Sequence, residues 1–154
     1  MSLPLWMLLG FCGWTFGILA LGIGVWRWTL ILSRRAAITD FPADTPHGSE
    51  GYRRVVRAHA NCLETLPVFA AVILTAATIH ADTRLLGVLA CTVMAARIVQ
   101  SCVHMLWVER PRTVAVRFAF FLVQFAAIVW MGVIVAGRAV TAGCSHGVHL
   151  CPLS

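Results

Sequence analysis

Lysine is absent from this sequence, and only 12% of its 154 residues are charged. A soluble domain normally carries about a quarter charged residues. Arginine supplies all the positive side chains, and the excess of basic over acidic residues gives a formal net charge of +6. The low charge content, together with a mean hydropathy of +0.85, excludes an ordinary soluble globular domain.

Several motifs of soluble chemistry are missing as well. The chain has no glycine-rich phosphate loop, no nucleophile elbow and no nucleic-acid-binding module. A pI near 9.6 is compatible with nucleic-acid binding, but most of the arginines lie at the ends of apolar segments, where basic residues usually set membrane topology. We therefore expect no nucleic-acid partner.

Four long apolar stretches make up most of the chain and leave no room for a second domain. A helix of about 20 residues crosses a hydrocarbon core about 30 Å thick, and each stretch is long enough to do so. We predict an all-α, integral membrane four-helix bundle that forms one domain over residues 1–154. The predicted helices cover roughly residues 3–32, 52–79, 84–108 and 113–140, and a tail follows over 141–154.

No basic residue precedes the first apolar stretch, and this stretch is too long for the core of a secretory signal peptide. We therefore expect it to be retained as a membrane helix. Trp26 and Trp28 near its end, with Arg27 between them, are typical of a membrane interface.

The arginines are distributed unequally between the two ends of the predicted helices. If the four helices alternate in direction, Arg84 and Arg138 fall on one side, and a larger group falls on the other side: Arg34, Arg35, Arg53, Arg54, Arg110 and Arg112. The positive-inside rule then places the 34–54 loop and the 109–113 turn in the cytoplasm. We predict a multi-pass protein of a bacterial inner membrane with both termini outside the cytoplasm.

A polar face interrupts the second apolar segment at RAHANCLETLPVF, residues 57–69. Arg57, Asn61 and Glu64 are spaced i, i+4 and i+7, so they share one face of a helix, and Arg53 lies one turn earlier on it. Ionisable groups at membrane depth are costly, and they usually pair with each other or line a site.

A second polar face is predicted on the third helix, where Arg97, Gln100 and His104 are spaced i, i+3 and i+7. One interpretation is a buried ion-pair network of Arg57, Arg97 and Glu64 that only holds the helices together. However, the arginines of the two faces outnumber the acids, and the surplus of guanidinium groups favours an anionic ligand.

The segment RAHANCLETLPVF resembles the signature R-A-x-x-N-x-x-E-x-x-P of the membrane-associated proteins in eicosanoid and glutathione metabolism (MAPEG). The sequences SRRA at residues 33–36 and AARIVQ at 95–100, and the Arg–Pro turn before the fourth helix, fit the same family. The resemblance thus covers nearly the whole chain.

This resemblance implies a homotrimer that binds glutathione between adjacent subunits, in the cytoplasmic half of the membrane. The implied activity is that of a glutathione-dependent transferase or peroxidase acting on hydrophobic small molecules or lipid peroxides that enter from the membrane lipids. One branch of the family is not enzymatic. The alternative is therefore a non-catalytic lipid-binding or scaffold protein with a structural polar network.

Carried over by position, the resemblance implies that residues of both polar faces bind glutathione. Gln100 and His104 stand where better-known members carry tyrosines, and both side chains still hydrogen-bond a peptide. The implied binding residues are Arg53, Arg57, Asn61, Glu64, Arg97, Gln100 and His104.

The family also stabilises the glutathione thiolate with an arginine near the turn between helices three and four. Here Arg110 and Arg112 flank Pro111, and Arg112 is our first choice for this role. Arg35 is a further candidate, for steering a carboxylate or protonating the product. This chemistry requires no metal.

Six cysteines are present, and four of them lie within apolar helices, where a cysteine usually acts as a small buried hydrophobe: Cys12, Cys62, Cys91 and Cys102. The tail contains two more, Cys144 and Cys151, together with His146 and His149. A disulfide between Cys144 and Cys151 and a disordered tail are equally compatible with this pattern. A Cys₂His₂ metal site would have unusually tight ligand spacing.

Overall fold

The computed structural model of the chain describes residues 1–35, 37, 48–108 and 110–147. In these residues every regular element is helical: α1 (Leu3–Gly17), the π-helix η1 (Ile18–Gly24), α2 (Val25–Leu32), α3 (Glu50–Thr78), α4 (Arg84–Leu106) and α5 (Pro111–Gly147). Because α1, η1 and α2 follow one another without a break, the chain forms four helices long and apolar enough to cross a membrane. The predicted all-α membrane fold is confirmed.

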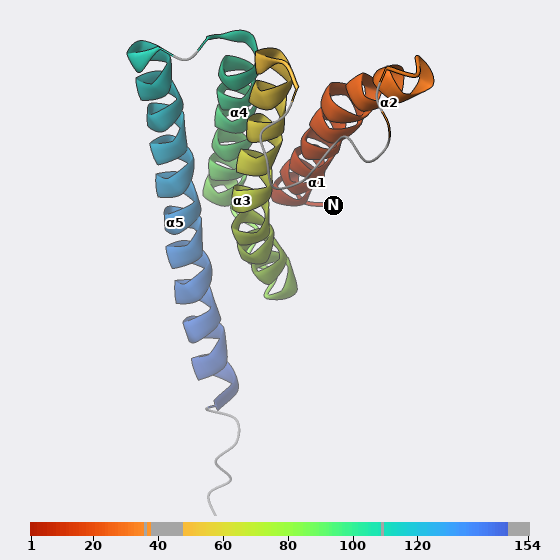
Figure 1. The fold of residues 1–154 in the computed structure, drawn as a ribbon. Coiled ribbons are helices and arrows are strands. Elements are labelled where there is room, and N and C mark those ends of the chain that lie inside the picture. Colours follow the sequence, from red (N-terminus) through yellow and green to blue (C-terminus); the bar gives the residue numbers. More distant parts are fainter. Residues whose placement is uncertain (36, 38–47, 109, 148–154) are drawn as a thin grey trace, which may run out of the picture.

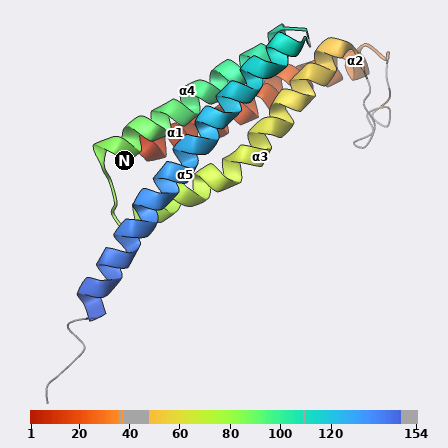
Figure 2. The same ribbon diagram turned by 90° about the vertical axis from the view of Figure 1, so that its left-hand side faces the viewer.

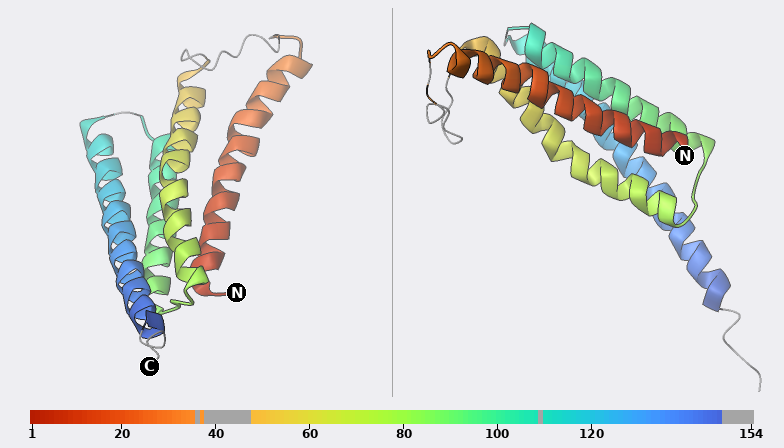
Figure 3. Two further views of the ribbon diagram at one scale, coloured as in Figure 1. Left: turned by 90° about the horizontal axis from the view of Figure 1, so that it is seen from below. Right: turned by 90° about the vertical axis from the view of Figure 1, so that its right-hand side faces the viewer.

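The four long helices run side by side, and α4 packs against α1, α3 and α5 (Figure 1). At the end of the bundle where α3 begins and α4 stops, α2 leans away from the other helices (Figures 1 and 3). At the opposite end α5 extends past its neighbours (Figure 2). The helices α3, α4 and α5 thus all pack against one another.

Side-chain caps start two of the helices, α3 and α4. Ser49 Oγ accepts a hydrogen bond from the Tyr52 amide at 3.3 Å, and Thr83 Oγ1 accepts one from the Leu86 amide at 3.2 Å. Each of these bonds satisfies a backbone donor that has no partner within the helix.

The last helix continues past residue 140 to Gly147, into the segment that the sequence assigned to a tail. Loss of apolar character at that point marks a change of environment, but it does not stop a helix, because the backbone hydrogen bonds do not depend on the polarity of the side chains. A disulfide between Cys144 and Cys151 lies outside what the structure describes.

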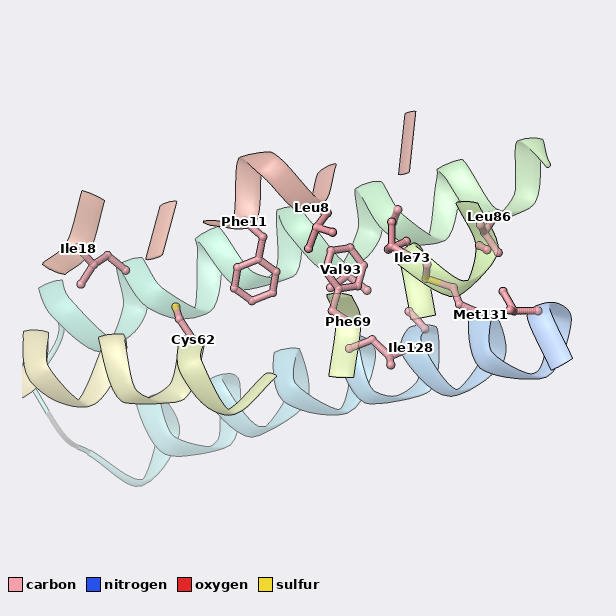
Figure 4. Close-up of a cluster of buried hydrophobic side chains, with 14 residues drawn as sticks. Leu8, Phe11, Ile18, Cys62, Phe69, Ile73, Leu86, Val93, Ile128 and Met131 are labelled. Atoms are coloured by element: carbon pink, nitrogen blue, oxygen red, sulfur yellow. The ribbon is translucent and has the colours of Figure 1, made fainter. Parts of the chain in front are cut away.

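The apolar core lies between α1, α3, α4 and α5. Phe11 of α1 and Phe69 of α3 meet with their ring centroids 5.7 Å apart, and Val93 of α4 and Met131 of α5 are fully buried in the same cluster (Figure 4). Because lipid is as apolar as these side chains, close packing rather than exclusion of water holds such helices together.

The four described cysteines differ in burial. Cys62 is buried as expected, whereas Cys91 and Cys102 are half-buried and Cys12 is exposed. The expectation of burial is wrong for Cys12, because this residue lies on the outer face of α1, where an apolar environment is supplied by lipid instead of by the core.

An aromatic clasp joins the end of the first membrane segment to the start of α3. The Trp26 and Tyr52 rings stack with centroids 4.0 Å apart, and Arg27 Nε donates to the Tyr52 hydroxyl at 2.6 Å. Gly48 lies against both rings with φ +81°. The clasp therefore fixes where α3 begins, just before Arg53 and Arg57.

We expect Gly48→Ala to destabilise the protein by about 1–3 kcal/mol. An alanine Cβ at this position would lie 2.9 Å from both Trp26 and Tyr52, and the positive φ adds strain for any residue with a Cβ. Thermal unfolding in detergent measures the effect.

Gly51→Ala is the matched control and should stabilise the protein by about 0.5–1 kcal/mol. Gly51 lies in the first turn of α3, where an alanine Cβ would not crowd a neighbour. Equal unfolding temperatures for the two variants would contradict the role of the clasp.

Candidate functional site

Polar side chains from three helices meet inside the half of the bundle where α3 begins and α4 ends. At their centre is Arg97 of α4, whose side chain is only 1% exposed. Its Nη1 donates to Gln100 Oε1 at 3.0 Å, and its Nη2 donates to Thr65 Oγ1 of α3. The guanidinium carbon lies 5.4 Å from the centroid of the Phe11 ring, within the range of a cation–π contact.

Gln100 extends this network to α5. Its Nε2 donates to the Arg117 carbonyl at 2.9 Å, and Gln124 Nε2 donates to Gln100 Oε1 at 3.0 Å. Gln100 Oε1 thus accepts from both Arg97 and Gln124. The amide ties α4 to α5 and holds the buried guanidinium in one place.

A second polar layer lies nearer the end of the bundle. Asn61 Nδ2 of α3 and His104 Nε2 of α4 are 2.9 Å apart. Beside this pair, the next residue of α3, Cys62, has its Sγ 3.6 Å from the Oγ of Ser101, which lies one turn before His104 on α4. His104 is buried, and Asn61 is half-buried. This layer joins the two predicted polar faces directly.

The charge of Arg97 is not neutralised inside the bundle. In the part of the chain that the structure describes, no carboxylate forms an ion pair with Arg97, and its Nε has no hydrogen-bond partner. Gln124 Oε1 also has none among the described residues. Glu64, although exposed, lies near enough to attract this buried cation electrostatically, and a further anion would lower the cost of burying it.

The charged residues of α3 lie elsewhere. Arg53, Arg57 and Glu64 are exposed on the outer surface of the single chain, with Asn61 between them at the boundary. The interpretation of Arg57, Arg97 and Glu64 as one buried ion-pair network is therefore wrong for the single chain. Instead, α3 carries a charged face of Arg53, Arg57 and Glu64 on the outside, and the buried polar residues of α4 lie behind it in the bundle interior.

Thr65 is a site residue that the sequence reasoning did not select. It lies one turn after Asn61 and directly beside Glu64 on α3, and its hydroxyl accepts from Arg97. Its spacing of i+4 from Asn61 was the available indication, because that spacing places it on the inner edge of the polar face.

The arginines near the turn, Arg110 and Arg112, are both exposed at the start of α5. The bond from Gln100 to the Arg117 carbonyl sets the register of the antiparallel α4 and α5. Because both helices rise by the same amount per residue, Arg112 lies at about the level of His104. Arg35 is also exposed and lies three residues after the end of α2, and α2 and the start of α5 lie on opposite sides of the bundle at this end (Figure 1).

The described residues contain no group of three or more histidine, cysteine or acidic side chains that could hold a metal ion. The cysteines and histidines of the tail lie beyond the described side chains.

A comparison with protein families matches the MAPEG family model to residues 11–137 of this chain. This range includes both polar layers, the charged face of α3 and the turn arginines. No curated protein and no solved structure gives a significant match to the chain.

Proposed function

The chain belongs to the MAPEG family, and from this premise we propose that it is a membrane-bound, glutathione-dependent transferase or peroxidase that acts on hydrophobic electrophiles or lipid peroxides. Its four apolar helices make it an integral, multi-pass membrane protein. The observation that carries the proposal is the charged face of α3, formed by Arg53, Arg57 and Glu64, with the buried Arg97 of α4 behind it.

The chemistry of glutathione fits this face. The tripeptide has two carboxylates and one ammonium group, which match guanidinium and carboxylate side chains respectively. Arg53 and Arg57 bind the carboxylates, Glu64 binds the ammonium group, and Asn61 hydrogen-bonds the peptide backbone. Arg97, Gln100 and His104 support this surface from inside the bundle and add positive potential beneath it.

The charged side chains of α3 are exposed, and this favours a glutathione site that lies between two subunits. Charged side chains at membrane depth almost always face a bundle interior or a polar cavity rather than lipid. Arg57 and Glu64 are exposed in the single chain, so a second copy of the chain is expected to cover them. A homotrimer, with glutathione between adjacent subunits, satisfies this requirement.

The arginine-rich end of the bundle is proposed to face the cytoplasm of a bacterium, with both termini on the other side of the inner membrane. Arg34, Arg35, Arg53 and Arg112 are all exposed at this end, as the positive-inside rule requires. The glutathione site then opens toward the compartment that contains the thiol.

The reaction is attack of the glutathione thiolate on the second substrate. In conjugation, the sulfur forms a bond to the electrophilic carbon, and the leaving group departs or the product takes up a proton. In peroxide reduction, the sulfur attacks the peroxide oxygen, the O–O bond breaks, and the released alkoxide is protonated. The resulting glutathione sulfenic acid condenses with a second glutathione thiol to give the disulfide and water.

Three exposed arginines are proposed to assist this reaction. Arg112 or Arg110 stabilises the thiolate, and Arg35 steers a carboxylate of the substrate or helps to protonate the product.

One observation favours the alternative, a non-catalytic lipid-binding or scaffold protein. Thr65, Arg97, Gln100 and Gln124 hydrogen-bond one another across α3, α4 and α5. Such a network stabilises the bundle even when no ligand is bound.

Thermal unfolding of the detergent-solubilised protein with millimolar glutathione separates the two functions. A ligand that binds only the folded state stabilises it by about 2.7 kcal/mol at a concentration one hundred times its Kd. We expect the unfolding temperature to rise with glutathione and to remain unchanged with the same concentration of free cysteine. An intact oligomer that glutathione does not stabilise would refute the transferase and leave the scaffold.

A further inference from the structure

The hydrogen bond between Asn61 and His104 defines the protonation of the histidine ring. The two nitrogens, Asn61 Nδ2 and His104 Nε2, are 2.9 Å apart. An amide nitrogen donates but does not accept, so Nε2 must be the acceptor. The ring is therefore neutral in this arrangement and carries its proton on Nδ1.

The same bond sets the orientation of the Asn61 amide. With its nitrogen held by His104, the carbonyl oxygen Oδ1 points to the other side of the side chain. Asn61 is only half-buried and lies between the exposed Arg57 and Glu64, so that side belongs to the charged face of α3. The bundle interior thus fixes which group Asn61 presents to a ligand.

We propose that His104 is a positioning residue for glutathione: its neutral ring holds Asn61 so that the amide carbonyl accepts from a backbone N–H of the tripeptide. This inference rests on the proposed function. Protonation of the ring places an N–H on Nε2, which removes the acceptor. The Asn61 amide then turns over, presents its NH₂ group to the ligand, and leaves the tripeptide N–H without its partner.

The surrounding helices carry other charged and titratable groups. Those with described side chains are Cys12 on α1; Arg27 on α2; Glu50, Tyr52, Arg53, Arg54, Arg57, His59, Cys62 and Glu64 on α3; Arg84, Cys91, Arg97 and Cys102 on α4; and Arg112, Arg117 and Arg138 on α5. Guanidinium, carboxylate and thiol groups ordinarily titrate above or below the range from pH 5.5 to 7.5, whereas an imidazole ordinarily titrates near 6.5. A change within this range therefore identifies a histidine.

The test uses γ-glutamyl-2-aminobutyryl-glycine, a tripeptide of the same shape that lacks the thiol. This ligand separates Asn61 positioning from ionisation of the sulfur. We expect its Kd for the intact protein, from isothermal titration, to rise as the pH is lowered from 7.5 to 5.5, by up to about tenfold, which corresponds to the loss of one hydrogen bond.

Two substitutions separate positioning from a merely structural role. His104→Gln supplies a carbonyl that accepts from Asn61 and does not titrate, so its binding at pH 7.5 should stay near that of the wild type and should not change with pH. His104→Phe keeps a planar ring without an acceptor and should bind about tenfold more weakly at both pH values.

His59→Gln is the matched control, because it removes an imidazole from α3 without touching the Asn61 bond. It should keep the pH dependence of the wild type. The inference is overturned if His104→Gln retains that pH dependence, or if the wild type binds the tripeptide equally well at both pH values. Absence of any tripeptide binding at pH 7.5 would instead refute the proposed function itself, and this inference with it.

The tautomer of the His104 ring can be measured without any bound ligand, and it tests the same inference. Nitrogen chemical shifts of ¹⁵N-labelled histidine should show His104 with a proton on Nδ1 and a bare Nε2 at pH 7.5. A neutral ring protonated on Nε2 would overturn the assignment even if one of the variants fails to fold.

Discussion

Arg112→Leu is expected to raise the pKa of bound glutathione's thiol by about two units and to slow conjugation at pH 7 roughly 25-fold. A free thiol has a pKa near 8.5, and lowering it by two units requires about 2.7 kcal/mol. A guanidinium about 4 Å away supplies about 4 kcal/mol at an effective dielectric constant near 20. One well-placed arginine is therefore sufficient. Thiolate absorbance of the glutathione complex, followed against pH, measures the ionisation directly.

The pH dependence of the rate provides a second readout. In the wild type the thiol is mostly ionised at pH 7, so raising the pH should add little. In Arg112→Leu the rate should recover partly as the pH rises, because bulk hydroxide then removes the proton that the arginine no longer helps to release.

Arg110→Leu is the matched control, since it removes the same charge two residues away, before α5 begins. Only Arg112 lies within the first turn of α5, at the level of His104 and the buried polar layer. If Arg110→Leu abolishes the ionisation and Arg112→Leu does not, the two roles are exchanged. If neither variant changes it, Arg35 is the next candidate. A wild-type complex without any thiolate would favour the scaffold.

The sequence predicted the parts of the fold that depend on local patterns. Each membrane helix followed from a long apolar stretch of the sequence. The π-helix over Ile18–Gly24 did not, because its residues are apolar throughout and leave no period to read. It brings Gly22 against α3, where an added Cβ would lie 2.6 Å from Val55 Cγ1.

The candidate site shows the same limit. Spacing alone placed Arg57, Asn61 and Glu64 on one face of a helix, and Arg97 and His104 on one face of another. The spacing of residues along one helix does not reveal which other helix packs against a given face of it. In the structure Arg97 is enclosed by α1, α3 and α4, whereas Arg57 remains on the surface of the single chain. The packing of three helices, which no local pattern encodes, made that distinction.

Glu64→Gln is expected to weaken glutathione binding by on the order of 10- to 100-fold. The substitution keeps the size and one acceptor oxygen of the side chain but removes its charge. A hydrogen bond between charged partners is worth about 1.5–3 kcal/mol, and each 1.4 kcal/mol changes the affinity tenfold. Isothermal titration of the folded oligomer measures the Kd, and the molar mass in detergent confirms that the variant still assembles.

His59→Gln on the same helix is the control for this result and should change the Kd less than twofold. At about 100° per residue, Glu64 lies about 20° around the helix from Arg57, whereas His59 lies about 200° away. The two substitutions thus sample opposite sides of α3, about 7.5 Å apart along the helix axis. Equal effects would show that the charged face has no special part in binding. In that case the exposed Arg57 and Glu64 would be explained by contacts between subunits alone, and the buried Arg97 network would serve only to hold α3, α4 and α5 together.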